Sequence, residues 1–254
     1  MPAELPRVRA TCYVTALREG GSMPGLVEAD DDGMYVVKFR GAGQGESALV
    51  AEVVAGELAR RLGLAVPDLA VVEIAPELGH AEPDPDIQEL LAASVGPNVG
   101  MDFLPGSLPF TLPLEGSVDP DLAADVVWFD ALVTNVDRTH RNPNLLIWHG
   151  RTWLIDHGAS FFRLHGERPL AETARAPVPG LADHVLLAAA GPIAAADERL
   201  AARADAAVEE VVSLVPEPWL GAQPELRRRD IADFLHARLE SPRTFVAEAE
   251  DARA

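Results

Sequence analysis

Two aspartates and two asparagines lie close together in the second half of the chain, in an order that suits phosphoryl transfer. Asp137 stands in a polar loop that also holds Asn142 and Asn144, and Asp156 follows the next apolar run. Phosphoryl transfer needs a carboxylate that orients the attacking hydroxyl, and oxygen ligands for Mg²⁺. Aspartate and asparagine carry the hard oxygen donors that Mg²⁺ prefers. Gly158 is expected to let the chain turn away closely after Asp156.

A lysine and a glutamate in the first half of the chain complete this set. Lys38 is the only lysine among 21 basic residues, and it lies in the strand-like segment 35–39. Strand alternation places it on the face opposite to Val37 and Phe39. Glu52 lies on an apolar stripe of the helix expected next, so a buried Glu52 needs a cation as its partner. Lys38 is the expected partner, and a strand lysine paired with a helix glutamate binds the ATP phosphates in kinases.

Three weaker candidates concern the nucleotide. Ser22 belongs to a glycine-rich segment at 19–25, between two expected strands, where a kinase places the loop that covers the phosphates. A plain hairpin loop is the alternative, because the Gly-x-Gly-x-x-Gly spacing is missing. Met101 and Phe103 end the last strand expected in the first half, before Pro and Gly at 105–106. We expect them to form a hinge that contacts adenine.

The elements that would position these residues fall into a β-rich half and a helical half. Strands are expected at 11–18, 26–29, 34–40, 68–74 and 99–104, with helices at 46–62 and 87–94. Further helices are expected at 121–134, 180–190, 197–214, 224–240 and 242–252, and a hairpin at 144–155. Asp119 and Pro120 are typical of the start of the first of these helices. The Pro- and Gly-rich segment 105–120 indicates the boundary between the halves.

Composition excludes several classes of protein. The net charge of −19 argues against nucleic-acid binding, which needs a basic surface. The chain has no run of about 18 uncharged apolar residues, so no membrane span is expected. The N-terminus lacks the apolar core of a signal peptide. Cys12 is the only cysteine, which excludes an internal disulfide and indicates a reducing cytoplasm.

These residues resemble the kinases related to HipA and, more distantly, the catalytic loop of phosphatidylinositol 3- and 4-kinase-like enzymes. The resemblance spans residues 11 to 165 and rests on segments 52–63, 135–147 and 153–158. It implies an α+β, bilobal, protein-kinase-like fold. Residues 1–104 would form an N-lobe with a small antiparallel sheet and one helix, and residues 105–254 a mainly helical C-lobe with the catalytic loop and the metal-binding segment. Asp137 would be the catalytic aspartate and Asp156 the metal-binding aspartate.

Two departures from the family pattern bear on this site. Asn-Val, rather than His-Arg, precedes Asp137. The usual spacing of five residues from aspartate to asparagine selects Asn142, whereas Asn144 stands directly before the apolar strand, as in the family. We favour Asn144 as a metal ligand, with Asn142 beside it.

The resemblance implies a phosphotransferase that uses ATP and Mg²⁺. Its acceptor is expected to be a Ser or Thr hydroxyl of a protein, because the related kinases phosphorylate proteins. A lipid or small-molecule alcohol is the alternative acceptor. A nucleotide-binding pseudokinase that acts through protein contacts is a second alternative, and a helical interaction protein without nucleotide is a third.

Overall fold

Five strands close into a barrel in the computed structural model, which describes residues 4–17, 23–43, 45–80, 82–111, 118–165 and 169–253. They are β1 (Arg7–Ala16), β2 (Gly25–Ala29), β3 (Met34–Lys38), β4 (Leu69–Ile74) and β5 (Gly96–Asp102), in the order β1-β2-β3-β5-β4. Four neighbouring pairs are antiparallel, whereas β1 and β4 run parallel from Arg7 opposite Val71 to Arg9 opposite Glu73. The expected small antiparallel sheet is therefore corrected to a barrel. The parallel pair satisfies backbone groups that an open sheet leaves unpaired at its edges.

The barrel has an apolar interior of its own. Val37 and Phe39 point into it, as the alternation of β3 predicts, and Val27 and Val72 join them from neighbouring strands. Helix α2 (Pro85–Ala93) packs on this cluster. The side chain of Lys38 consequently lies on the outer face of the barrel.

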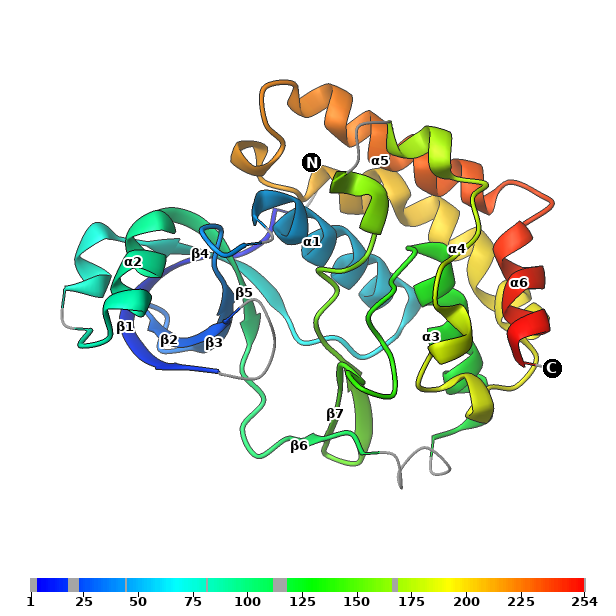
Figure 1. Cartoon of the computed structure of the whole chain (residues 1–254), viewed down its shortest axis with the longest axis horizontal. Coiled ribbons are helices and arrows are strands. Elements are labelled where there is room, and N and C mark those ends of the chain that lie inside the picture. Colours follow the sequence, from blue (N-terminus) through cyan, green and yellow to red (C-terminus); the bar gives the residue numbers. More distant parts are fainter. Residues whose placement is uncertain are drawn as a thin grey trace.

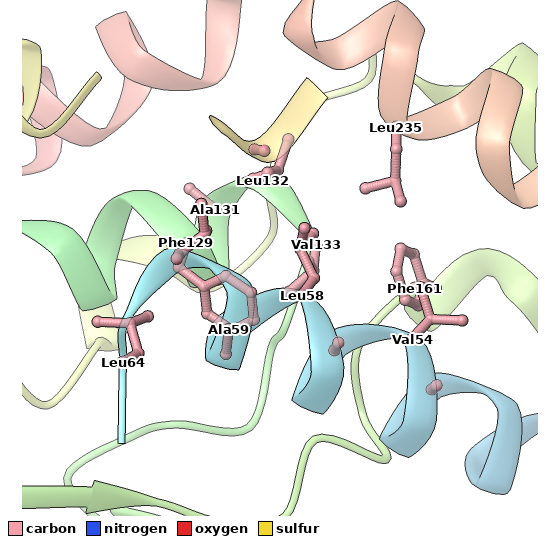
Figure 2. Packing of buried hydrophobic residues seen from close by; sticks show 14 of the residues in the cluster. Val54, Leu58, Ala59, Leu64, Phe129, Ala131, Leu132, Val133, Phe161 and Leu235 are labelled. Atoms are coloured by element: carbon pink, nitrogen blue, oxygen red, sulfur yellow. The ribbon is translucent and has the colours of Figure 1, made fainter. Parts of the chain in front are cut away.

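A second and larger core joins α1 to the helices of the second half. It combines α1 (Gly45–Leu62) with α3 (Pro120–Leu132), α4 (Ile193–Ser213), α5 (Pro224–Leu239) and α6 (Thr244–Arg253). In Figure 1, α1 lies between the barrel and these helices. Figure 2 shows Val54 and Leu58 of α1 in a common interior with Phe129 and Leu235. The expected N-lobe helix thus shares its core with the second half, and the division at residues 104 and 105 stays a prediction.

Local signals in the sequence fix the start of α3 and the hairpin after it. Asp119 accepts hydrogen bonds from the backbone N–H of Asp121 (2.9 Å) and Leu122 (3.1 Å), which confirms the expected cap. The expected hairpin is also confirmed as β7 (Leu145–Trp148) and β8 (Arg151–Leu154). A short strand that the pattern did not predict, β6 (Leu108–Pro109), extends this sheet.

The helix expected at 180–190 is absent from the described chain there, and two 3₁₀ turns stand in its place, Leu181–Asp183 and Leu187–Ala189. Between them the backbone pairs with the polar loop, because His184 bridges to Thr139 and the N–H of Val185 donates to the carbonyl of Arg138 at 3.1 Å. Further 3₁₀ turns among the described residues are Pro76–Gly79, Phe162–His165, Leu170–Thr173 and Glu217–Trp219. Among the described helices, none is long and apolar enough to cross a bilayer.

Candidate active site

Lys38 joins the barrel to two carboxylates of distant segments. Its Nζ forms ion pairs with Glu52 of α1 and with Asp156, the latter at 2.5 Å to Oδ1. Glu52 is fully buried. Burial would lower the pKa of Lys38, but the two carboxylates raise it above the ordinary lysine value. The ammonium therefore keeps its charge while it is largely withdrawn from solvent.

Glu52 is held by His157 as well as by Lys38. The backbone N–H of His157 donates to Oε2 of Glu52 at 2.9 Å, and Nδ1 of the same histidine lies 3.3 Å from Oε1. The imidazole packs edge-on against the ring of Phe129. Burial would raise the pKa of Glu52, but Lys38 and His157 hold it well below its usual range. The sequence did not predict that His157 contacts Glu52.

Gly158 leaves space for the lysine. A Cβ atom on Gly158 would lie 2.9 Å from Nζ of Lys38. Gly158 stands in a turn, as expected, and the close approach of Lys38 is a second reason for a glycine here. That approach brings together residues 120 positions apart in the chain, so no local pattern could have revealed it.

Two asparagines of the polar loop contact the carboxylate of Asp137. Nδ2 of Asn142 donates to Oδ2 of Asp137 at 2.8 Å, and Nδ2 of Asn144 lies 3.4 Å from the same oxygen. Oδ1 of Asn135 accepts from the backbone N–H of Asp137 at 3.1 Å. Burial, and secondarily the nearby charge of Asp156, raises the pKa of Asp137, while the hydrogen bond from Asn142 opposes the rise. The loop thus presents a carboxylate that is half-buried and fixed by amide donors.

The backbone at the open end of the hairpin brings Asn144 beside the segment that ends in Asp156. The N–H of Ile155 donates to the carbonyl of Asn144 at 3.1 Å. Asn144 (φ 49°) and Asp156 (φ 56°) both adopt the left-handed conformation. Asparagine and aspartate tolerate this conformation better than other non-glycine residues. Such backbone conformations gather at functional sites.

The oxygen donors in this region fit a magnesium ion. Asp156 offers a carboxylate, and Asn142 and Asn144 offer amide oxygens. Because both asparagines use their amide nitrogens on Asp137, their oxygens remain available, and no hydrogen bond within the described ranges engages them. Carboxylate and amide oxygens are suitable ligands for a hard cation.

The remaining sequence candidates concern the nucleotide. Met101 lies on β5 opposite Val36 of β3, two residues from Val99, which lies opposite Lys38. Met101 and Lys38 therefore share the outer face of the barrel. Phe103 follows the end of β5 and donates its N–H to the carbonyl of Met34 at 2.9 Å. Ser22 lies outside the residues that the structure describes.

A buried ionic cluster behind the loop was not anticipated. Asp130 on α3 is fully buried and pairs with Arg138, the residue after Asp137. Nε2 of His184 lies 2.9 Å from Oδ2 of Asp130. Burial would raise the pKa of Asp130, but Arg138 and His184 hold it well below its usual range. A lone aspartate in the otherwise apolar segment 126–132 was the available signal for this cluster.

Comparisons with known proteins find kinases that this chain resembles in sequence and in fold. A family model described as HipA-like kinase matches residues 13–244. Among solved structures, the Helicobacter pylori proinflammatory kinase CtkA superposes with a TM-score of 0.60 and 12% identity, covering 96% of this chain and 99% of that one. This second likeness concerns the fold alone. The complete CtTel1 dimer is also matched, with a TM-score of 0.34 and 11% identity over 90% of this chain and 11% of that one. The search of curated proteins returned no match.

Proposed function

The chain belongs to the HipA-like kinase family and is a kinase, and we propose that it transfers the γ-phosphoryl group of Mg-ATP to a Ser or Thr hydroxyl of a protein. The observation that carries this proposal is the meeting of Lys38, Glu52 and Asp156 at one ammonium group. A kinase uses such a lysine to hold ATP phosphates and such an aspartate to hold Mg²⁺. The three residues come from β3, α1 and the end of the hairpin, so their meeting is a property of the fold.

We assign the nucleotide to the outer face of the barrel. Lys38 would bind the α- and β-phosphates, and Glu52 would keep its ammonium in place. Met101 and Phe103 would contact adenine at the end of β5, and Ser22, between β1 and β2 in the sequence, would contact the phosphates. The shared face of Met101 and Lys38 supports this assignment.

We assign the chemistry to the polar loop. The carboxylate of Asp137 would orient the acceptor hydroxyl and take its proton as the oxygen attacks the γ-phosphorus and the bond to the ADP oxygen breaks. Asp156 and Asn144, with Asn142 beside it, would hold Mg²⁺. When bound, the ion would neutralise phosphate charge and orient the triphosphate. Asn142 and Asn144 would also keep Asp137 aimed at the acceptor, which their hydrogen bonds support.

The test is transfer of labelled γ-phosphate from ATP, by the wild type and by Asp137→Asn, to proteins of a cell lysate. We expect labelled Ser or Thr with the wild type, and a loss of about two to four orders of magnitude with Asp137→Asn. Label in lipids or small molecules instead of protein would assign the alternative acceptor. Binding of Mg-ATP without any transfer would assign a pseudokinase, and absence of binding would reject the nucleotide site.

A further inference from the structure

The side chain of Arg138 connects three segments that meet at the proposed active site. It is 1% exposed, and its Nε donates to Oδ2 of Asp130 on α3 at 2.5 Å. Nη1 of the same guanidinium donates to the carbonyl oxygen of Asn144 at 2.5 Å and to that of Ile155 at 3.3 Å. Asn144 begins the hairpin and Ile155 precedes Asp156. Arg138, which directly follows Asp137, therefore contacts the backbone of Asn144 and of the residue before Asp156.

The carboxylate of Asp130 binds the guanidinium of Arg138 and accepts hydrogen bonds from two further side chains. It accepts from Nδ2 of Asn135 at 3.0 Å, from Arg138 and from Nε2 of His184. Nδ1 of His184 accepts a hydrogen bond from the N–H of Leu186 at 3.1 Å. Nε2 of His184 therefore carries the hydrogen and donates the hydrogen bond to Asp130. The negative charge of Asp130 and the positive charge of Arg138 cancel, so the buried cluster has no net charge when His184 is neutral.

The segment around His184 also supports the loop through its backbone. Val185 donates to the carbonyl of Arg138, and His184 bridges to Thr139. Nδ1 of His140 lies 3.2 Å from the carbonyl of Asp183. The loop that carries Asp137 is thus fixed from α3, from the hairpin and from this segment.

We propose that Arg138, held by Asp130 and His184, is the positioning residue that sets the spacing of Asp137, Asn144 and Asp156. This inference rests on the proposed function. A buried ion pair gives little net stability compared with apolar side chains of the same volume, so stability is a weak reason for placing one here. A planar guanidinium can bond a carboxylate and two carbonyl oxygens in different directions at once. The ammonium of a lysine lacks this fixed fork, so Arg138→Lys is the informative substitution.

The experiment compares Arg138→Lys with Arg243→Lys as a matched control. Arg243 has the same kind of partners, the carboxylate of Asp197 and the carbonyl of Leu239, but it lies among α4, α5 and α6. We expect Arg138→Lys to lower kcat by about ten- to a hundredfold and to raise the half-saturating Mg²⁺ concentration by about tenfold, as for residues that orient metal ligands. At saturating Mg²⁺ the KM for ATP should change by less than about threefold. Arg243→Lys should lose stability and keep all three values once folded.

Calorimetry of ATP binding with and without Mg²⁺ gives a readout that does not depend on turnover. The Mg²⁺-dependent part of binding should weaken in Arg138→Lys and persist in Arg243→Lys. If the wild type binds Mg-ATP but transfers no phosphoryl group, the proposed function fails and this binding difference still decides the role of Arg138. If the wild type does not bind Mg-ATP, both proposals fail.

A second variant covers the case in which Arg138→Lys does not fold. His184→Phe removes one donor to Asp130 and leaves the guanidinium in place, so it should shift kcat and the Mg²⁺ requirement in the same direction, by a smaller factor. A folded variant of either kind with wild-type values overturns the proposal, as does an equal loss in Arg243→Lys. Failure of both variants to fold would assign the cluster to folding alone and also overturn it.

Discussion

Three carboxylates at or beside the site, those of Glu52, Asp130 and Asp137, have pKa values that their surroundings shift. Glu52 and Asp130 are buried, and each stays ionised because basic side chains contact it. Asp137 contacts amides instead of cations, and its pKa is raised by burial and by the charge of Asp156. An aspartate whose pKa is raised is a better proton acceptor than an ordinary one, provided that it remains ionised at the working pH.

Gly158 gives the first prediction at this scale. Gly158→Ala would place Cβ 2.9 Å from Nζ of Lys38. This ammonium group cannot move away freely, because it is paired with both Glu52 and Asp156. We expect ATP-dependent turnover to fall by about ten- to a hundredfold, the cost of a small misplacement of a phosphate-binding group. Thermal unfolding should change little, because the contact is with the end of a side chain. Gly79→Ala, which meets Leu91 at an ordinary 3.4 Å, is the control and should keep full activity.

The two asparagines can be separated by two different readouts. Asn144→Gly removes the proposed ligand without straining the backbone at φ 49°, and should raise the Mg²⁺ requirement by at least about tenfold. Asn142→Ala should leave that requirement nearly unchanged. It should move the acid limb of the kcat/KM profile to higher pH, because the hydrogen bond from Asn142 lowers the pKa of Asp137 and its loss raises it further. The reverse pattern of Mg²⁺ dependence would assign the metal to Asn142.

At the scale of elements, sequence patterns succeeded where a local rule decides the structure. The cap at Asp119 and the hairpin at 145–154 follow from residues within a few positions of one another. The helix expected at 180–190 failed because a tertiary contact outweighed helix propensity: His184 and Val185 pair with the loop at Arg138 and Thr139. The burial of Arg138 could not be inferred from a loop rich in polar residues.

The cluster that ties α3 to the loop predicts a pH dependence of stability. The folded-state pKa of Asp130 lies below its unfolded value, so its contribution is fully present above the unfolded value of about 3.9 and is lost as the pH falls through the folded value. Asp130→Asn lacks this titration, so its free energy of unfolding should fall less steeply between about pH 5 and pH 2. At pH 7 the variant should be less stable by about 3 kcal/mol or more, because Arg138 remains buried without its partner.

Urea unfolding followed by tryptophan fluorescence at several pH values measures this effect. Asp121→Asn, an exposed aspartate in the first turn of the same helix, is the control and should keep the wild-type slope. Glu52 also has a lowered pKa, so part of the acid sensitivity should remain in Asp130→Asn. Identical slopes for wild type and Asp130→Asn would show that Asp130 does not contribute.

At the scale of the whole molecule, the site lies where two separate cores meet. Lys38 comes from the barrel, whose interior cluster includes Val37, and Glu52 comes from α1, which belongs to the larger helical core. Composition and strand patterns predicted a β-rich half and a helical half. They did not predict barrel closure, because Arg7–Arg9 pair with residues more than 60 positions away and no turn sets that register. Nor did they predict that α1 packs with the second half, since its residues are apolar on nearly every face.

This arrangement predicts that Mg-ATP stabilises the molecule as a whole through contacts to both cores. At a free concentration of about 100 times Kd, a ligand that binds only the folded state adds about 2.7 kcal/mol. For a chain of this size the Tm should rise by roughly 5 to 10 °C. The measurement is thermal unfolding with Mg-ATP, with ATP plus a chelator, and with Mg²⁺ alone, and only the first should give the full rise.

Variants show which residues produce this shift. Lys38→Met should abolish it, because no other lysine is present in the chain to bind the phosphates. Asp137→Asn should keep it, because that carboxylate is assigned to the acceptor hydroxyl and not to the nucleotide. Arg229→Met, on the exposed face of α5, should also keep it. A shift that survives in Lys38→Met and disappears in Asp137→Asn would reverse the two roles, because the ligand would then be bound by the loop of the helical half and not by the outer face of the barrel.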